Sequence, residues 1–230
     1  MLILGIESSA VSASAAITRD GALLGQCCLK SGLTHSQTLL PMAEELLRHT
    51  GTALGDLDAV AVAQGPGSFT GVRIGVATAK GLAHGAGLPC IGVDALEALN
   101  RSAGCFDGIV CPIQDARAGQ VYGAAFRGKE RLTADEPMKL EDFLAKVRAL
   151  GKRFLFLGDG VPVHREKIRE ILGDDAVFAP VHQCFLRPSA AGALALEKAE
   201  RTDYLGLQAT YLRPPNAQKN KKLMEAMSRG

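Results

Sequence analysis

The sequence predicts an α/β fold in which two lobes each hold a mixed sheet flanked by helices. Short apolar strands alternate with amphipathic helices along most of the chain, and this order is typical of sheets covered by helices. Residues 2–17 and 109–126 also share one pattern, in which an apolar strand is followed by an acid, a small turn and a second strand. This weak internal repeat indicates that the second half of the chain starts the same arrangement again.

The first lobe is expected to span residues 1–104. Its predicted strands lie at residues 2–6, 11–18, 22–29, 59–63 and 89–93, and its predicted helices at residues 35–50, 68–84 and 94–102. The first strand is a short apolar run suited to the centre of a sheet. Arg19-Asp20-Gly21 is a hairpin signal between the next two strands. Pro41 lies inside the first helical pattern, so we expect a kink or a later start there.

The second lobe is expected to span residues 105–215. Its predicted strands lie at residues 109–114, 120–126, 154–157 and 176–179, and its predicted helices at residues 140–150, 163–172 and 189–201. The remaining residues, 216–230, form a basic tail that contains Lys219, Lys221 and Lys222. We expect this tail to be disordered and solvated, with contact to phosphate groups or to a partner protein as the alternative.

Composition points to a globular protein of the cytoplasm. An apolar content of 47% and a charged content of 22% are ordinary for a folded domain. The formal net charge of +2 is too small to indicate nucleic-acid binding through the overall field. The sequence has no apolar run of about 18 residues and no secretory signal, so no membrane span is expected. The six cysteines form no C-x-x-C pair, which favours reduced, mostly buried thiols.

The rest of the chain is organised around residues 62–83. This stretch reads as the end of a strand, a tight Gly65-Pro66-Gly67 turn and a long helix that Ser68 or Thr70 can cap. A phosphate-binding loop would need a Gly-Lys-Ser/Thr ending, which is absent here. A hydrolase nucleophile elbow would need glycine two residues before and two after the serine, and these positions hold Pro66 and Thr70. The sequence therefore favours a turn that starts a packed helix.

On a helical wheel, this helix shows two apolar faces. We assign one face to the chain's own sheet, and it holds Phe69, Val72, Val76, Ala79 and Ala83. We assign the other face to a partner, because small residues let another helix approach and a bare apolar strip marks an interaction site. The predicted partner interface consists of Thr70, Ile74, Ala77 and Gly81, together with Leu39, Ala43 and Leu46 from the flanking helix. Arg73, Lys80 and His84 fall within a wedge of about 40°.

Several motifs resemble a known family. They are Ile3–Ser9, His35-Ser36, the Gly65–Gly75 segment Gly-Pro-Gly-Ser-Phe-Thr-Gly-Val-Arg-Ile-Gly, and Asp115-Ala116-Arg117 with Val121-Tyr122. Together they resemble the TsaB family, also called YeaZ, which has the two-lobed actin, Hsp70 and sugar-kinase (ribonuclease H-like) fold. The resemblance covers most of residues 1–126 and continues weakly to Tyr211-Leu212-Arg213.

The resemblance implies a non-catalytic accessory subunit rather than an enzyme. In that family the subunit pairs with its paralogue TsaD, which transfers threonylcarbamoyl to the adenine next to the anticodon of tRNA. The implied partners are TsaD, the ATPase TsaE and, through the complex, tRNA, while TsaC supplies threonylcarbamoyl-adenylate. A homodimer is possible when the chain is alone.

TsaD-type chains carry a His-x-x-x-His metal motif, and the resemblance lays its two histidines on Ala95 and Leu99. Neither side chain can bind a metal ion, whereas neutral imidazole can. Only Glu97 survives from that segment. We therefore predict no catalytic residue, no metal ligand and no cofactor.

Two alternatives stay open at this point. The first is an ATP-dependent small-molecule kinase or ATPase of the same fold, in which Glu7 and Asp115 would flank a nucleotide phosphate and its magnesium. The bulky Arg117 argues against this, and Gly158-Asp159-Gly160 reads as a plain turn more readily than as an adenosine contact. The second is a metal-independent peptidase, although no Ser-His-Asp or Cys-His signature is present.

Overall fold

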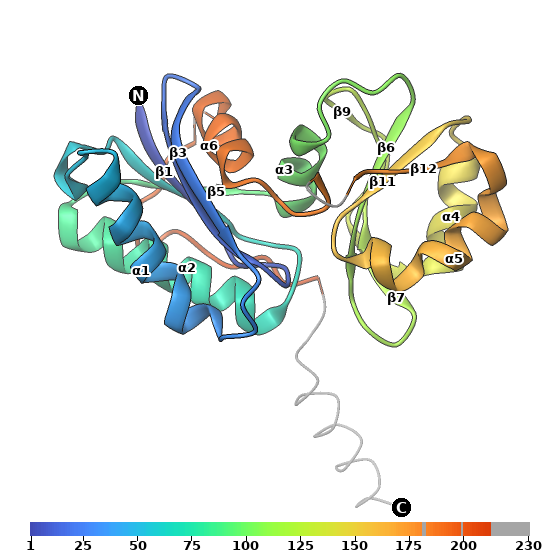
Figure 1. The fold of residues 1–230 in the computed structure, drawn as a ribbon, viewed down its shortest axis with the longest axis horizontal. Helices are drawn as coiled ribbons and strands as arrows, with labels where there is room; N and C mark the ends of the chain where they lie inside the picture. The colour runs from blue at the N-terminus through green and yellow to red at the C-terminus, as the bar shows by residue number, and fades with distance from the viewer. Residues whose placement is uncertain (181–182, 199, 213–230) are drawn as a thin grey trace, which may run out of the picture.

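The computed structural model describes residues 1–180, 183–198 and 200–212. These residues form two lobes, each with one sheet and helices packed on it (Figure 1). The two-lobed α/β arrangement of mixed sheets with flanking helices confirms the predicted fold class. Among the described residues, no helix is both long and apolar enough to cross a lipid bilayer.

The sheet of the first lobe has the strand order β3-β2-β1-β4-β5. Its strands are β1 (Leu2–Glu7), β2 (Ala13–Arg19), β3 (Ala22–Leu29), β4 (Ala59–Ala63) and β5 (Cys90–Val93). The first three strands are antiparallel neighbours, and β1, β4 and β5 run parallel. β1 and β4 are buried along their whole length, as expected for parallel strands covered on both faces.

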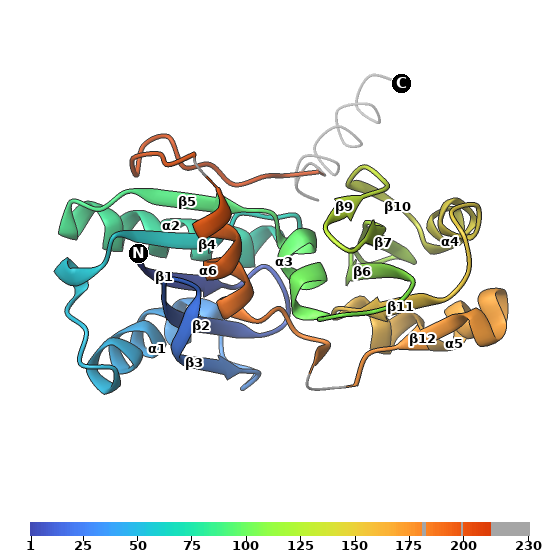
Figure 2. The same cartoon turned by 90° about the horizontal axis from the view of Figure 1, so that it is seen from above.

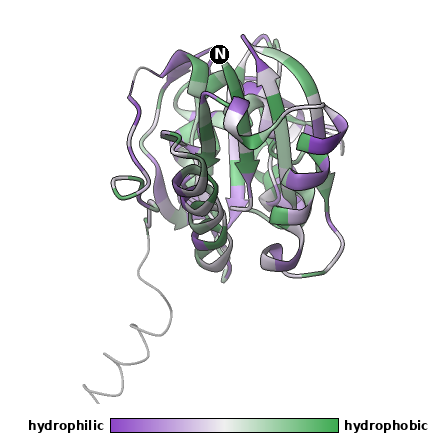
Figure 3. Cartoon of the chain, turned by 90° about the vertical axis from the view of Figure 1, so that its left-hand side faces the viewer, coloured by the Kyte–Doolittle hydropathy of each residue, from purple (hydrophilic) through white to green (hydrophobic). Residues whose placement is uncertain are grey.

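Helices cover both faces of this sheet (Figure 2). On one face lie α1 (His35–His49) and α2 (Phe69–Ala86), and on the other lies α6 (Pro188–Glu197). Because side chains alternate along a strand, Leu4 and Ile6 pack under α1 and α2, whereas Ile3 packs under α6. Figure 3 shows hydrophobic segments in the central strands and hydrophilic segments on outer loops and helices.

The sheet of the second lobe has the strand order β10-β7-β6-β11-β12, with the short β8 and β9 paired at its side. Its strands are β6 (Ile109–Asp115), β7 (Gln120–Gly123), β8 (Phe126–Arg127), β9 (Glu130–Arg131), β10 (Glu136–Lys139), β11 (Phe154–Leu157) and β12 (Ala176–Phe178). Its helices are α4 (Leu140–Arg148) and α5 (Gly160–Leu172), and α3 (Ala95–Ser102) lies between the lobes (Figure 1). Short 3₁₀ turns lie at Leu54–Asp56 and Gly173–Asp175.

The predicted end of the second lobe at residue 215 needs correction. Helix α6, which we placed in that lobe, packs on the first sheet, where Ala191 and Leu194 join a core cluster with Ile3. The chain then runs back along the first lobe as a C-terminal strap, residues 202–212. Thr202 exchanges two backbone hydrogen bonds of 2.7 and 3.0 Å with Cys90 and so covers the edge of β5. The predicted basic tail, residues 216–230, lies outside the described residues.

Helix α1 begins at His35 and continues through Pro41, so of the two predicted effects, a kink or a later start, the later start is wrong. The Thr34 N–H donates to Gln37 Oε1 at 3.3 Å, and this contact fixes the first turn before the proline is reached. Pro41 is exposed on the outer side of the helix.

Candidate functional site

Helix α2 starts directly after the Gly65-Pro66-Gly67 turn, and Ser68 caps it. The Ser68 hydroxyl accepts a hydrogen bond from the Gly71 N–H at 3.3 Å, so Ser68 rather than Thr70 is the capping residue. The long helix that follows lies beside α1 on the same face of the sheet (Figure 1).

The two predicted faces of α2 point in the predicted directions. On the inward face, Val72, Val76, Ala79 and Ala83 are buried, and Phe69 is half-buried. On the outward face, which we call the α2 strip, Thr70, Ala77 and Gly81 are exposed and Ile74 is half-buried. The α2 strip is therefore free in the isolated chain.

The predicted contribution of α1 to the same surface is wrong. Leu39 and Ala43 are 0% exposed and Leu46 is 8% exposed, because they fill the core between α1 and the sheet. A partner cannot reach them while the chain is folded. The apolar residues that α1 and its preceding loop do expose are Leu40, at 41%, and Leu33, at 59%.

The C-terminal strap covers the flank of α2 that faces away from α1. The ring of Tyr204 lies 4.2 Å from that of His84, and the ring of Tyr211 lies 4.8 Å from that of Phe69. Between these two contacts, Leu207 is 1% exposed and joins the core of the first lobe. The α2 strip is thus bounded by α1 on one side and by the strap on the other.

A second group of polar residues lies where the two lobes meet. Glu7, at the end of β1, is fully buried, and its Oε1 accepts a hydrogen bond of 2.6 Å from the Ser9 hydroxyl. The Gln114 side-chain amide, from β6 of the other lobe, donates to the same hydroxyl at 3.1 Å. Burial raises the pKa of Glu7 to about 7, although its bonds to Ser9 oppose the rise. Through Ser9, Glu7 therefore takes part in a contact between the two lobes.

The other acidic candidate, Asp115, lies in a closely packed turn. Its N–H donates to Asp159 Oδ1 at 3.2 Å, and its own carboxylate accepts from the Arg117 N–H at 3.0 Å. A Cβ on Gly158 would stand 2.0 Å from the Ile113 carbonyl oxygen, so this glycine is needed for backbone packing. Burial raises the pKa of Asp159 to about 6. These contacts favour the plain-turn interpretation of residues 158–160.

The positions that resemble the metal motif of TsaD lie in the core. Ala95 is 0% exposed and Leu99 is 1% exposed, and both join the core cluster around α3. The Glu97 N–H donates to the capping carboxylate of Asp94 at 2.7 Å, and Glu97 Oε1 lies 3.9 Å from Arg101 Nη2. Across residues 1–180, 183–198 and 200–212, no group of three or more His, Cys, Asp or Glu could hold a metal ion.

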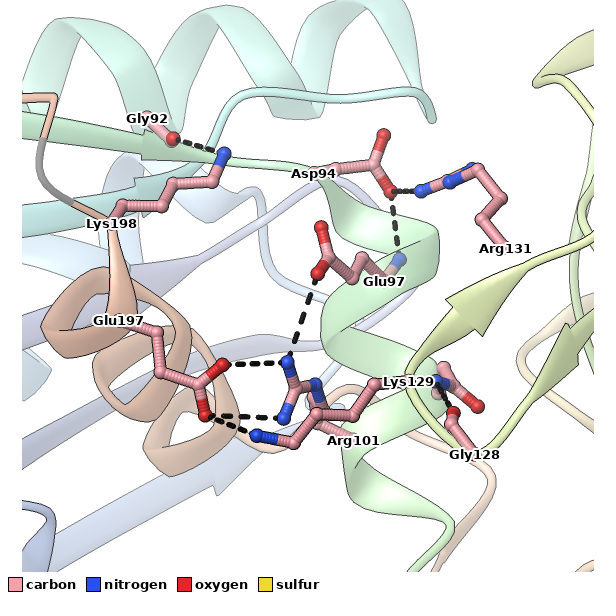
Figure 4. Close-up of polar contacts among 10 residues, drawn as sticks. Gly92, Asp94, Glu97, Arg101, Gly128, Lys129, Arg131, Glu197 and Lys198 are labelled. Carbon is pink, nitrogen blue, oxygen red and sulfur yellow. Dashed lines mark hydrogen bonds and ion pairs between the residues drawn. The ribbon is translucent and has the colours of Figure 1, made fainter.

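Ion pairs around α3 join the two lobes (Figure 4). Asp94 accepts from Arg131 of β9 at 2.8 Å, and Arg101 donates to Glu197 of α6 at 2.7 and 3.2 Å. Lys129 donates to the same Glu197 carboxylate at 2.9 Å. Sequence reasoning missed this network. Asp94 was detectable as a helix cap, but its partners come from distant parts of the chain.

Comparison with known proteins supports the sequence resemblance. Residues 30–191 match the family model described as TsaD, tRNA N6-adenosine threonylcarbamoyltransferase. The tRNA threonylcarbamoyladenosine biosynthesis protein TsaB of Bacillus subtilis is 35% identical over 222 residues, which cover 95% of this chain and 96% of that protein. TsaB of Escherichia coli is 41% identical over 56% of this chain and 57% of its own.

Solved structures give the same result. A Pseudomonas aeruginosa protein described as similar to the peptidase YeaZ has a TM-score of 0.76 and 25% identity, over 92% of this chain and 99% of its own. A hexokinase from Thermus thermophilus, at a TM-score of 0.51 and 12% identity over 86% of this chain and 99% of its own, shares only the fold.

The match to the catalytic paralogue covers a smaller part of both chains. The tRNA N6-adenosine threonylcarbamoyltransferase of Geotalea uraniireducens is 34% identical over 42% of this chain and 33% of that protein. By contrast, the match to the Bacillus subtilis TsaB spans nearly the whole of both chains. This chain belongs to the family that the TsaD model describes and, within it, to the TsaB proteins of tRNA threonylcarbamoyladenosine biosynthesis.

Proposed function

We propose that this chain is a non-catalytic accessory subunit. It binds TsaD and supports the transfer of threonylcarbamoyl to the adenine next to the anticodon of tRNA in the cytoplasm. The observation that carries the proposal is the burial of Ala95 and Leu99 at the positions that resemble the TsaD metal motif. A methyl and an isobutyl group offer no lone pair to a metal ion, and both pack into core that leaves no space for one.

The α2 strip supports the partner half of the proposal. Its small side chains allow the axis of a partner helix to come close, because the distance between packed helices depends on the residues at the contact. An apolar strip left open on one side of a helix marks an interaction site. Leu40 of α1 and Leu33 of the loop before it are further exposed apolar side chains. The same surface would meet a second copy when TsaD is absent.

Neither alternative function gains an observation in its favour. Glu7 is fully buried and its Oε1 is bonded to Ser9, while its Oε2 has no hydrogen-bond partner among the described residues. No group of three or more His, Cys, Asp or Glu that could hold a metal ion includes it in the part of the chain that the structure describes. Asp115 is occupied by the backbone of its own turn. TsaE and, through the complex, tRNA remain expected partners.

The test is a reconstitution with the TsaD protein of the same organism, TsaE and a TsaC supply of threonylcarbamoyl-adenylate. Modified adenosine in tRNA is measured with this chain alone, with TsaD alone and with both together. We expect modification only when TsaD is present, and a strong increase when this chain is added. Transfer by this chain alone, or full activity of TsaD without it, would contradict the proposal.

A further inference from the structure

Two cations, Arg73 and Lys80, and His84 lie in a row along α2, between the α2 strip and the C-terminal strap. Arg73, Lys80 and His84 are seven and four residues apart, which places them within about 40° on the helix. Arg73 and His84 are exposed, and Lys80 is half-buried. The row lies on the side of α2 that faces the strap, because the ring of Tyr204 stacks on that of His84.

Arg73 is held in place and has no counter-ion among the described residues. The centre of its guanidinium lies 5.1 Å from the Phe69 ring centroid, and Phe69 is itself stacked on Tyr211. A cation over an aromatic face is oriented as well as attracted. No carboxylate of the described residues lies within 4.0 Å of the Arg73 nitrogens. The guanidinium is thus oriented at the rim of the strip, and no carboxylate from the part of the chain that the structure describes pairs with it.

A second copy of this chain would match the row poorly. Antiparallel pairing of α2 with the α2 of a copy would set Arg73 and Lys80 against the same row, and like charges across an interface are unfavourable. Helix α1 exposes two acids, and Glu45 already pairs with Arg48 of its own helix, so only Glu44 is left to compensate. The charge pattern therefore favours a different protein, rather than a second copy, as the partner at the α2 strip.

We propose that the helix that docks on the α2 strip carries carboxylates along its edge facing the strap, and that Arg73 binds one of them. This inference rests on the proposed function, since it specifies the chemistry of the partner at the same surface. The planar guanidinium suits a two-point contact with a carboxylate. Tyr211 acts as a positioning residue, because it holds the Phe69 ring on which Arg73 lies.

The experiment measures the dissociation constant for the TsaD protein of the same organism at low and at raised salt. The variants are Arg73→Gln, Arg73→Glu and Tyr211→Leu, with Arg148→Glu on the exposed face of α4 as the matched control. Ala77→Glu on the strip itself tests docking independently of the charge.

We expect Arg73→Gln to weaken binding about tenfold at low salt, as for a lost hydrogen bond to a charged group. Its affinity should also depend less on salt. Arg73→Glu should weaken binding further, Tyr211→Leu should have a smaller effect, and Arg148→Glu should match wild type.

Wild-type binding by Arg73→Glu, with Ala77→Glu inactive, would overturn the charge inference and leave the docking surface intact. Wild-type binding by both variants would overturn the docking surface as well. If Arg73→Glu instead disrupts self-association and spares TsaD binding, the occupant is a second copy and the inference is wrong.

Discussion

The Ser8 hydroxyl donates a hydrogen bond of 2.9 Å to the carbonyl oxygen of Gly71, and this contact joins the end of β1 to the first turn of α2. Two glycines make the approach feasible. A Cβ at Gly71 would lie 2.0 Å from the Ser8 carbonyl oxygen, and one at Gly75 would lie 2.5 Å from the Ser8 hydroxyl. The glycine spacing in the Gly65–Gly75 segment thus serves helix packing rather than phosphate binding.

We predict that Gly75→Ala destabilises the chain by about 1–3 kcal/mol, because the added methyl forces Ser8 or the helix to move. Gly85→Ala is the matched control in the same helix, where an added Cβ meets nothing within 4 Å. It should stabilise the chain by up to about 1 kcal/mol through helix propensity. Urea unfolding measures both. A shift of the two midpoints in the same direction would contradict this account.

We also predict that stability falls as the pH rises from about 4.5 to about 7. Burial raises the pKa of Glu7 from 4.5 to about 7, so in this window the folded chain keeps a proton that the unfolded chain has lost. The free energy of unfolding then decreases with pH, on the order of 1–3 kcal/mol for this group. Glu7→Gln removes the contribution of this group and should reduce the slope between pH 5 and pH 7.5, while Asp159 and Asp135, whose pKa values burial also raises, keep part of it. The control is Glu45→Gln, at an exposed carboxylate. An unchanged slope in Glu7→Gln would rule out Glu7 as the source.

Local patterns predicted most of the helices and strands. They failed for elements that depend on contacts with distant parts of the chain. Strand β4 matches its predicted bounds exactly as residues 59–63, because a short apolar run between turns has few alternatives. Strands β9 and β10 were missed, since both are short and polar and exist through pairing with β8 and β7. Helix α6 is apolar nearly all round, so its sequence does not indicate which lobe it covers.

At the candidate site too, local patterns predicted some features and missed those that depend on distant contacts. The wheel correctly separated the buried and the outward faces of α2, because a regular helix brings residues three and four apart to the same side. On α1 the apolar residues form a single face. This face packs against the chain's own sheet, so a partner cannot reach it. The hydrogen bond from Gln114 to Ser9 joins residues 105 positions apart, and a local pattern carries no signal for it.

Cysteine reactivity gives a further prediction. Cys28 and Cys105 are exposed, whereas Cys111 is fully buried and burial raises its thiol pKa well above the usual range. We expect a brief reaction with a thiol reagent under native conditions to label Cys28 and Cys105 and to spare Cys111. Mass spectrometry of tryptic peptides measures the labelling at each site. All six thiols should react after denaturation without reductant, and fewer than six would indicate a disulfide.

The last prediction compares two neighbouring residues of α2 that face in opposite directions. Ala77 is exposed on the α2 strip, whereas Val76 is 7% exposed and packs against the sheet. Ala77→Glu should keep the melting temperature of the isolated chain near wild type, because its carboxylate is solvated. It should abolish binding to TsaD, where the same carboxylate would be buried without a partner.

Val76→Glu should instead lower the melting temperature sharply, because it buries a charge in the core of the isolated chain. Thermal melting by circular dichroism and size-exclusion chromatography with TsaD separate the two effects. Wild-type affinity of Ala77→Glu for TsaD would show that the α2 strip is not the docking surface. An unfolded Ala77→Glu beside a folded Val76→Glu would reverse the assignment of the two faces, because only the face that packs on the sheet is needed for the monomer to fold.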